Sequence, residues 1–274
     1  MGKRPEWWLS VLARIWPLTW ISARATRWPV IGPVVAKMTL PLFSGDNLNI
    51  TYVPIHRPLE PLQSTPLPIR VGEELIRRAS HRVIIHRCTC RDARQCVNHP
   101  IDLGCMLLGP GAVEIDPRIA RHVSEDEAVA HLHRAVAAGL VPMAGRVKID
   151  NVIWGVRDLG KLLTICYCCH CCCTILTSGR YLPQGALDAL VPLKGLRVQI
   201  DIDRCLKCGT CVEACHMNAL ELGDNGIHHS ALRCKGCGRC LSVCPHGAIA
   251  IDVDDPEAAV EELVVRIGSR IEWA

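Results

Sequence analysis

Apolar residues recur at helical spacing in two stretches of the chain. In the first, Ser124 followed by Glu127 forms a capping box that predicts a helix start, and Gly139 follows where that helix should end. In the second, Asp255 and Pro256 are typical of a helix N-terminus. The apolar positions that follow are Ala128, Val129, Leu132, Ala135 and Val136 in the first helix, and Ala259, Val260, Leu263, Val264 and Ile267 in the second. We expect the second helix to pack across a neighbouring sheet or onto the middle of the chain.

Shorter runs complete the pattern. A helix is expected over Glu73–Ile85 and a pair of strands within Arg146–Trp154. Four short strands are expected near the end of the chain, at Leu196–Ile202, Ala219–Leu222, Ile227–His229 and Ala248–Val253. The fold class is therefore α+β, with one domain over residues 71–195, a smaller one over 196–254 and a terminal helix over 255–274.

Residues 1–28 form a separate segment in which tryptophans and basic residues interleave: Trp7, Trp8, Trp16, Trp20 and Trp28 with Lys3, Arg4, Arg14, Arg24 and Arg27. Its apolar stretch is interrupted by Arg14 and Pro17 and is too short to cross a membrane, which takes about 20 residues. Three interpretations stay open. The segment contacts a membrane surface, packs on its own or a partner protein, or is a signal peptide with a cleavage site at Ala23–Ala25. Arg14 and Glu6 argue against the signal peptide.

Prolines dominate the next segment. Ten of the 18 prolines fall within residues 1–68, and five of them crowd the end of that stretch: Pro54, Pro58, Pro61, Pro66 and Pro68. Because proline interrupts helices, we interpret residues 29–70 as an extended arm that lies over this protein or a partner.

Composition narrows the class of protein. Hydrophobic residues make up 49% of the 274 residues and charged residues 21%, which excludes a disordered, collagen-like or coiled-coil chain. The net charge of +4 is uneven, since residues 1–100 alone hold 14 basic and 6 acidic residues. Eighteen cysteines in short clusters indicate metal sites rather than a disulfide framework. Abundant thiols favour the reducing cytoplasm, or the inner face of its membrane.

Two cysteine groups lie in the middle domain. The first comprises Cys88, Cys90, Cys96 and Cys105, and the second comprises Cys166, Cys168, Cys169, Cys171, Cys172 and Cys173. Thiolates select iron–sulfur clusters, zinc or Cu(I), and a cubane cluster needs four of them. Three models are open: each group builds its own cluster, the groups share one cluster or a larger one, or they bind zinc. We expect one or two iron–sulfur centres here and regard zinc as the lesser alternative. His99 and His170 are further candidate ligands.

The third cysteine group is an internal repeat, whose copies start at Cys205 and Cys234, 29 positions apart. Each copy has the spacing C-x2-C-x2-C-x3-C, and its members are Cys205, Cys208, Cys211 and Cys215, then Cys234, Cys237, Cys240 and Cys244. Three thiolates at this spacing surround one corner of a cubane. We expect the fourth to open a helix that carries its sulfur to the other cluster. Gly209 and Gly238 allow the backbone to approach the cluster closely.

This repeat resembles the bacterial-type ferredoxins with two [4Fe-4S] clusters, over about residues 198–254. The resemblance implies a pseudo-two-fold domain with crossed ligation: Cys205, Cys208, Cys211 and Cys244 hold one cluster, and Cys234, Cys237, Cys240 and Cys215 the other. His216 departs from the pattern, because proline follows the fourth cysteine in the second copy. A proton on His216 would make the reduction potential of the cluster held by the preceding Cys215 pH-dependent, although a tolerated substitution is the simpler interpretation. The upstream region is more distantly similar to cysteine-rich modules fused to ferredoxins in microbial redox complexes, but lacks their Cys-Cys-Gly signature.

The sequence thus predicts an iron–sulfur electron-transfer protein that works with redox partners or as a subunit of a larger oxidoreductase. Residues 1–28 would supply a peripheral membrane contact or a partner contact. A redox enzyme that binds substrate at a cluster within residues 88–173, or a thiol redox sensor, is the alternative. The chain lacks the motifs of nucleotide-binding loops and of zinc proteases, and no nucleic-acid partner is expected.

Overall fold

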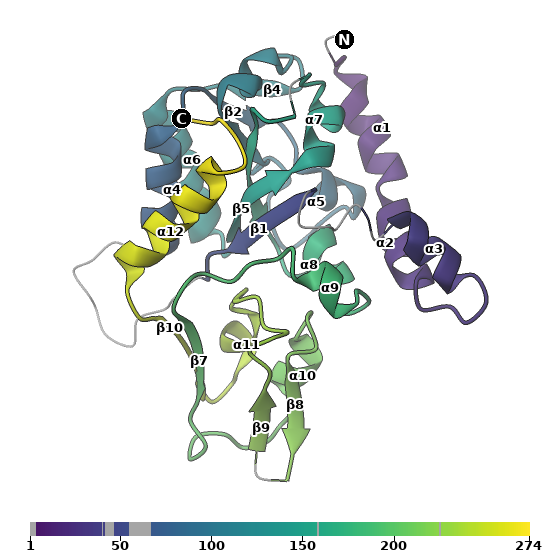
Figure 1. Ribbon diagram of the computed structural model, residues 1–274, viewed down its shortest axis with the longest axis vertical. Helices are drawn as coiled ribbons and strands as arrows, with labels where there is room; N and C mark the ends of the chain where they lie inside the picture. Colours follow the sequence, from purple (N-terminus) through teal and green to yellow (C-terminus); the bar gives the residue numbers. More distant parts are fainter. Residues whose placement is uncertain (1–3, 40, 42–46, 55–66, 158, 225) are drawn as a thin grey trace.

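A six-stranded antiparallel sheet forms the centre of the molecule (Figure 1). The computed structural model describes residues 4–39, 41, 47–54, 67–157, 159–224 and 226–274. In spatial order the strands are β1 (Leu48–Tyr52), β5 (Val141–Val147), β6 (Leu163–Cys168), β3 (Met106–Leu108), β2 (Arg82–Ile85) and β4 (Ala120–His122). The antiparallel pairing of β3 with β6 places Met106 opposite Ile165. The next position along this register brings Cys105 opposite Cys166, although the two belong to different sequence groups.

Three helices cover one face of this sheet: α4 (Leu67–Arg78), α6 (Glu125–Ala137) and α12 (Pro256–Gly268). Their apolar faces share one core with Met106, Leu108 and Ile165 of the sheet. The capping box at Ser124 and the Asp255 cap are both formed, which confirms the predicted starts of α6 and α12. The terminal helix therefore packs onto the middle domain.

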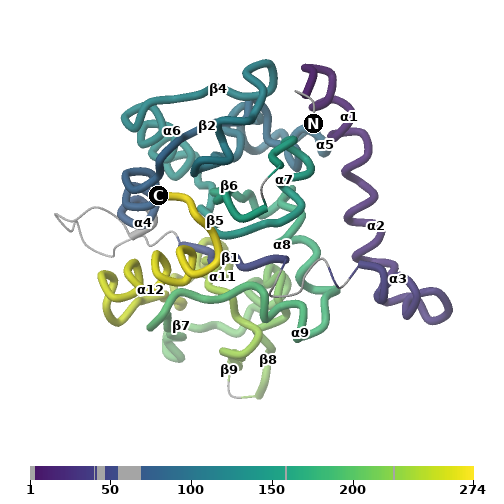
Figure 2. The backbone as a smooth tube through the Cα atoms, turned by 45° about the horizontal axis from the view of Figure 1, so that its top comes forward, coloured from purple at the N-terminus to yellow at the C-terminus, as the bar shows by residue number. Residues whose placement is uncertain are grey.

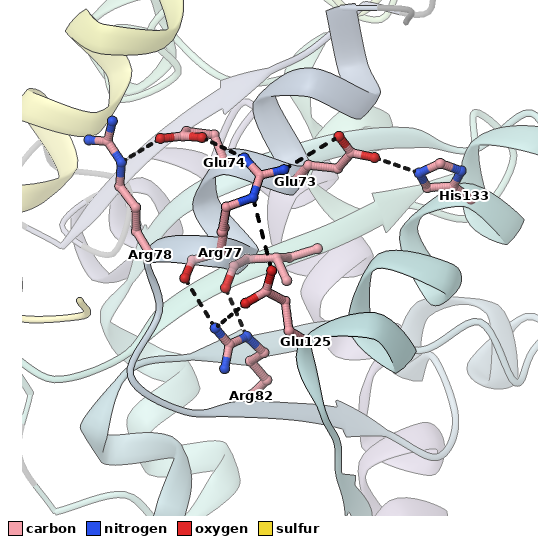
Figure 3. Close-up of polar contacts among 8 residues, drawn as sticks. Glu73, Glu74, Arg77, Arg78, Arg82, Glu125 and His133 are labelled. Carbon is pink, nitrogen blue, oxygen red and sulfur yellow. Dashed lines mark hydrogen bonds and ion pairs between the residues drawn. The ribbon is translucent and has the colours of Figure 1, made fainter.

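Ion pairs at the surface link α4 to its neighbours (Figure 3). Glu73 accepts from His133 Nε2 of α6 at 2.8 Å, and Arg77 of α4 lies 4.0 Å from Glu125 of α6. The Arg82 Nε of β2 donates to the Ile76 carbonyl at 2.8 Å. Exposed pairs of this kind contribute less than about 1 kcal/mol each, so they orient α4 more than they stabilise it.

Helices α1 (Trp7–Ile15), α2 (Pro17–Ala25) and α3 (Gly32–Thr39) lie along the other side of the molecule (Figures 1 and 2). Leu9 and Leu12 of α1 are buried in a core with α7 (Lys148–Trp154) and the short helix η2 (Pro110–Glu114). The N-terminal segment thus packs on its own protein through one face. Among the described residues, no helix is long and apolar enough to cross a membrane.

The prediction of an extended arm over residues 29–70 is wrong where the structure describes it. Helix α3 and strand β1 lie within this segment, and β1 pairs with β5 in register Leu48↔Val147. The prolines mislead because Pro17 and Pro33 fall in the first turn of α2 and α3, where a helix needs no N–H from them. The structure does not describe Pro58, Pro61 and Pro66, and it describes only the backbone of Pro68.

Two predicted elements of the middle domain also differ. Helix α4 begins before Glu73 and ends at Arg78, and residues 82–85 form strand β2. Residues 148–154, expected as part of a strand pair, form helix α7, which ends at Gly155 in the left-handed conformation. In both cases a run of apolar residues fits helix and strand equally, and tertiary pairing decides between them.

The smaller domain lies below the sheet in the view of Figure 1. Strand β7 (Leu196–Ile200) pairs with β10 (Ile249–Val253), and β8 (Leu220–Gly223) forms a hairpin with β9 (Gly226–His229), which confirms the four predicted strands. Between them lie two short helices, α10 (Thr210–Ala214) and α11 (Arg239–Val243). The remaining helices, α5 (Thr89–Ala93), α8 (Thr174–Gly179) and α9 (Gln184–Leu187), flank the cysteines of the middle domain.

Candidate metal centres

The two copies of the repeat have the same backbone. Positive φ angles occur at corresponding positions of both copies: Lys207, Gly209 and Asn218 in the first, and Gly236, Gly238 and Gly247 in the second. Gly209 and Gly238, both left-handed, are the N-caps of α10 and α11. The expectation that the fourth cysteine opens a helix is wrong, because Cys215 and Cys244 take extended backbone angles and end these helices.

The first ferredoxin set comprises Cys205, Cys208, Cys211 and Cys244. All four line one small cavity, together with Ile200, Ile227 and Ile249. Burial raises the pKa of Cys211, and the Cys244 and Cys205 thiols add to this effect. The structure therefore brings three cysteines of the first copy together with the fourth of the second.

The second ferredoxin set is the reciprocal arrangement. It combines three cysteines of the second copy with the fourth of the first: Cys234, Cys237, Cys240 and Cys215. Burial, together with the nearby Cys215 and Cys234 thiols, raises the pKa of Cys237 to about 12. The Ala219 N–H donates to Cys215 Sγ at 3.2 Å, and the Ala248 N–H donates to Cys244 Sγ at 3.3 Å. Equivalent donors in both sets favour thiolates, which the buried, apolar surroundings alone would disfavour.

The two sets differ in depth. Cys208 of the first set is exposed at the surface of the domain. Cys215, Cys234 and Cys237 of the second set pack against a core that contains Tyr52 of β1 and Cys168 and Cys173 of the middle domain. Burial raises the pKa of Tyr52, and Cys173, Cys168 and Cys237 all contribute to that rise. Tyr52 thus shares one core with the second ferredoxin set and with two cysteines of the middle domain.

The ten cysteines of the middle domain do not divide as their order in the sequence suggests. A compact quartet combines Cys96 of the first group with Cys169, Cys171 and Cys172 of the second, and their sulfurs all lie within 4.8 Å of one another. The Cys96–Cys171 and Cys171–Cys172 Sγ distances are both 3.6 Å. The model in which each sequence group builds its own cluster therefore does not fit the structure.

The other six, which we call the cavity thiols, are Cys88, Cys90, Cys105, Cys166, Cys168 and Cys173. Cys105 Sγ lies 3.2 Å from Cys166 Sγ, and Cys168 Sγ lies 3.1 Å from Cys173 Sγ. All six line a cavity of about 480 Å³, and Cys169 borders it as well. The two sequence groups are therefore adjacent in space, as in the second of our three models, but they contribute to two thiol sites rather than to the single one of that model.

Helix α2 and its C-cap residue also line the cavity. They contribute Thr19, Ser22, Ala23 and Thr26, whose spacing places them on one helical face and whose side chains are short. The rim reaches the surface at Ile149 and Val152. The cavity is thus a largely apolar space with thiols on one side.

Two side chains tie the cavity thiols to their surroundings. Thr174 Oγ1 accepts from Trp16 Nε1 at 2.7 Å and from Trp20 Nε1 at 3.1 Å, and lies 3.3 Å from Cys90 Sγ. Because both lone pairs of the hydroxyl are occupied, its proton is directed to the Cys90 sulfur. The α1–α2 segment is thus hydrogen-bonded to the thiol site through the hydroxyl of Thr174.

Arg91 supplies a buried positive charge between the two thiol sites. Its guanidinium donates to the carbonyls of Pro100 and Tyr167 at 2.8 and 2.7 Å, and to that of Leu103. The pKa of Arg91 is raised, because the Cys88, Cys169 and Cys105 thiols outweigh the effect of burial. A buried cation costs free energy unless anions accompany it, so this arrangement fits thiolates that hold metal.

The candidate histidines lie beside these sites. His99 Nδ1 is hydrogen-bonded to the Ala138 carbonyl at 3.1 Å, and is not part of the compact quartet. The His170 ring stacks on His216, with 6.2 Å between centroids. This pair connects the loop of the compact quartet to the second ferredoxin set. Neither Tyr52, Arg91 nor Thr174 is a candidate from sequence, because only the tertiary fold places them beside sulfur.

The comparisons with known proteins agree with the geometry of the smaller domain. A family model described as a 4Fe-4S dicluster domain matches residues 198–251. No curated protein matches the chain. The C-terminal part is therefore a dicluster ferredoxin-like domain, and its thiol sets, with their backbone donors and buried sulfurs, fit such clusters.

Proposed function

We propose that this protein passes single electrons through two [4Fe-4S] clusters, bound at the two ferredoxin sets, to a third iron–sulfur centre at the cavity thiols. It would act as a subunit or partner of a larger oxidoreductase. A [4Fe-4S] cluster bound to four thiolates accepts or donates one electron. The observation that carries the proposal is that the second set packs against the same core as Cys168 and Cys173 of the middle domain, whereas the first set reaches the surface at Cys208.

The surface end of this series suits a protein partner. The exposed apolar side chain of Leu206 lines the same cavity as the exposed Cys208, and Ile202 of the same loop is exposed as well. Small redox interfaces are transient and need only a limited contact area. Electrons would enter at the first set and reach the second, whose sulfurs pack against the core that holds Tyr52.

The outer face of α1–α3 supports a peripheral membrane contact as the second element of the proposal. Leu18 is 64% exposed and Met38 75% exposed, and Trp28, Ile31 and Val34 of the same segment are exposed as well. Residues 7–45 contain four basic side chains and no carboxylate. A surface with exposed apolar side chains whose charged residues are all basic fits a membrane of anionic lipid. The site of action would be the reducing cytoplasm, at the inner membrane face.

Iron and sulfide content of anaerobically purified protein, with EPR of the reduced form, tests the electron-transfer proposal. We expect at least about twelve iron atoms per chain, since each cubane holds four. Cys240→Ala should remove about four of these iron atoms, and Cys90→Ala, as a separate variant, should also lower the iron content. Ser242→Ala, at an exposed side chain, should leave the iron content unchanged. About eight iron atoms in the native protein, unchanged in Cys90→Ala, would refute the third centre.

A redox enzyme is the second candidate, because the cavity extends beyond its thiols to a rim at the surface. Its space and apolar walls are typical of small-molecule sites. In this case an added small disulfide or thiol should change one EPR signal of the reduced protein. A large residue on the wall of α2, as in Ala23→Phe, should remove that response and leave the ferredoxin signals intact.

A further inference from the structure

We propose that the compact quartet, Cys96, Cys169, Cys171 and Cys172, binds a single Zn²⁺ ion in tetrahedral geometry and no iron–sulfur cluster. The proposal is independent of the electron-transfer function. It concerns four thiols next to the cavity, of which Cys169 and Cys172 are buried in the same core as Tyr167.

The spacing of the sulfurs carries the argument. A Zn–S bond of about 2.3 Å places two sulfurs of a tetrahedral site about 3.8 Å apart. The quartet has two Sγ–Sγ distances of 3.6 Å, and all of its sulfurs lie within 4.8 Å of one another. A cubane carries its thiolates on four separate iron atoms, which sets the sulfurs about 6 Å apart. The quartet is therefore the size of a mononuclear site.

The ferredoxin sets provide a comparison within the same molecule. Over the residues that the structure describes, the quartet is the one group of three or more His, Cys, Asp or Glu whose ligand atoms lie within 4.8 Å of one another. Neither ferredoxin set meets that limit, although the four cysteines of the first set line one cavity. The structure thus holds two kinds of thiol site, one wide and one compact.

The local fold also fits a structural ion. Cys96 follows α5, and the other three thiols lie in the turn between β6 and α8, so an ion would close a long loop between two parts of the chain. Arg94 Nη1 donates to the Cys171 carbonyl at 3.4 Å, and the buried Arg91 charge lies near Cys169. These cations offset the net charge of −2 that Zn²⁺ with four thiolates carries. By fixing residues 169–172, the ion would position Cys168 and Cys173, the cavity thiols on either side.

The test measures zinc and iron separately on the full chain, purified anaerobically. We expect about one zinc per chain, and a zinc K-edge absorption spectrum with sulfur neighbours alone at about 2.3 Å. Cys96→Ala should lose the zinc and keep the iron of the ferredoxin sets. Val97→Ala, at a neighbouring side chain that is 93% exposed, is the matched control and should keep both. The spectrum of the unmodified protein stays informative even if Cys96→Ala fails to fold.

Two results would overturn the proposal. One is a native protein without zinc whose Cys96→Ala variant loses about four iron atoms, since the quartet would then hold a cubane. The other is a mononuclear iron signal that Cys96→Ala removes. The electron-transfer proposal fails on different data, namely low iron content or no reduced-cluster EPR signal, so the two outcomes are distinguishable.

Discussion

The hydroxyl of Thr174 is the point at which the N-terminal helices are bonded to the thiol site, and its removal tests that connection. Thr174→Val keeps the shape of the side chain and removes one oxygen. The indoles of Trp16 and Trp20 then lose their acceptor, which now lies at 2.7 and 3.1 Å. Cys90 loses a donor at 3.3 Å.

The expected cost follows from these two indoles. A partly buried donor left without a partner costs about 1–1.5 kcal/mol, so two of them should cost about 2–3 kcal/mol. Thr177→Val is the matched control on the same helix, because its hydroxyl bonds only the carbonyls of Cys173 and Thr174. Loss of such a local bond should cost well under about 1 kcal/mol.

Hydrogen exchange of the native holoprotein measures the effect where it should occur. Amides of α1 and α2 that exchange through opening of the N-terminal helices should exchange about 30- to 150-fold faster in Thr174→Val, the ratio that 2–3 kcal/mol implies. Amides of α6, on the other face of the sheet, should not change. Equal exchange of α1 and α2 in Thr174→Val and Thr177→Val would refute the reasoning.

Three further predictions concern charge. Burial raises the pKa of Asp150 to about 6, although Thr164 Oγ1 donates to it at 2.7 Å. The stability of the protonated form is fully present below about pH 4 and is lost as pH rises through 6. Asp150→Asn should therefore raise the free energy of unfolding by about 3 kcal/mol at pH 7 and hardly change it at pH 4. Burial and Arg180 lower the pKa of His216, so the potential of the second ferredoxin cluster should stay constant from pH 6 to 8 in EPR titrations, where a coupled proton would shift it by about 59 mV per pH unit. Vesicles with anionic lipid should bind the protein in flotation assays, and Leu18→Asp should weaken that binding while neutral vesicles bind neither form; equal binding to both vesicle types would contradict the role of charge.

The ferredoxin-like domain could be predicted almost completely from sequence, because its chemistry is local. Each copy places three thiols within seven residues, and the left-handed glycine at Gly209 or Gly238 determines the turn that gathers them. The strands were predictable since each is a short run bounded by turn residues. The position of the helices relative to Cys215 and Cys244 was not, because it depends on where the backbone leaves helical angles.

The middle domain could be assigned a chemistry but not a geometry. Cys105 and Cys166 are 61 positions apart in sequence, and only the pairing of β3 with β6 brings their sulfurs to 3.2 Å. Cys96 likewise joins thiols 75 positions later through the path of the loop after α5. Spacing motifs describe loops that close on themselves, and neither site is of that kind.

The geometry of strand β6 explains why six cysteines within eight residues are not a surplus. Side chains alternate between the two faces of a strand. Cys166 and Cys168 accordingly belong to the core beside the cavity, whereas Tyr167 between them belongs to the core on the opposite face. The chain then turns, and Cys169, Cys171 and Cys172 stay on the Tyr167 side before Cys173 returns to Cys168 at 3.1 Å. The alternation along β6 and the turn after it therefore distribute the six thiols over two adjoining sites, and a single inserted residue in β6 would exchange the faces of Cys166 and Cys168.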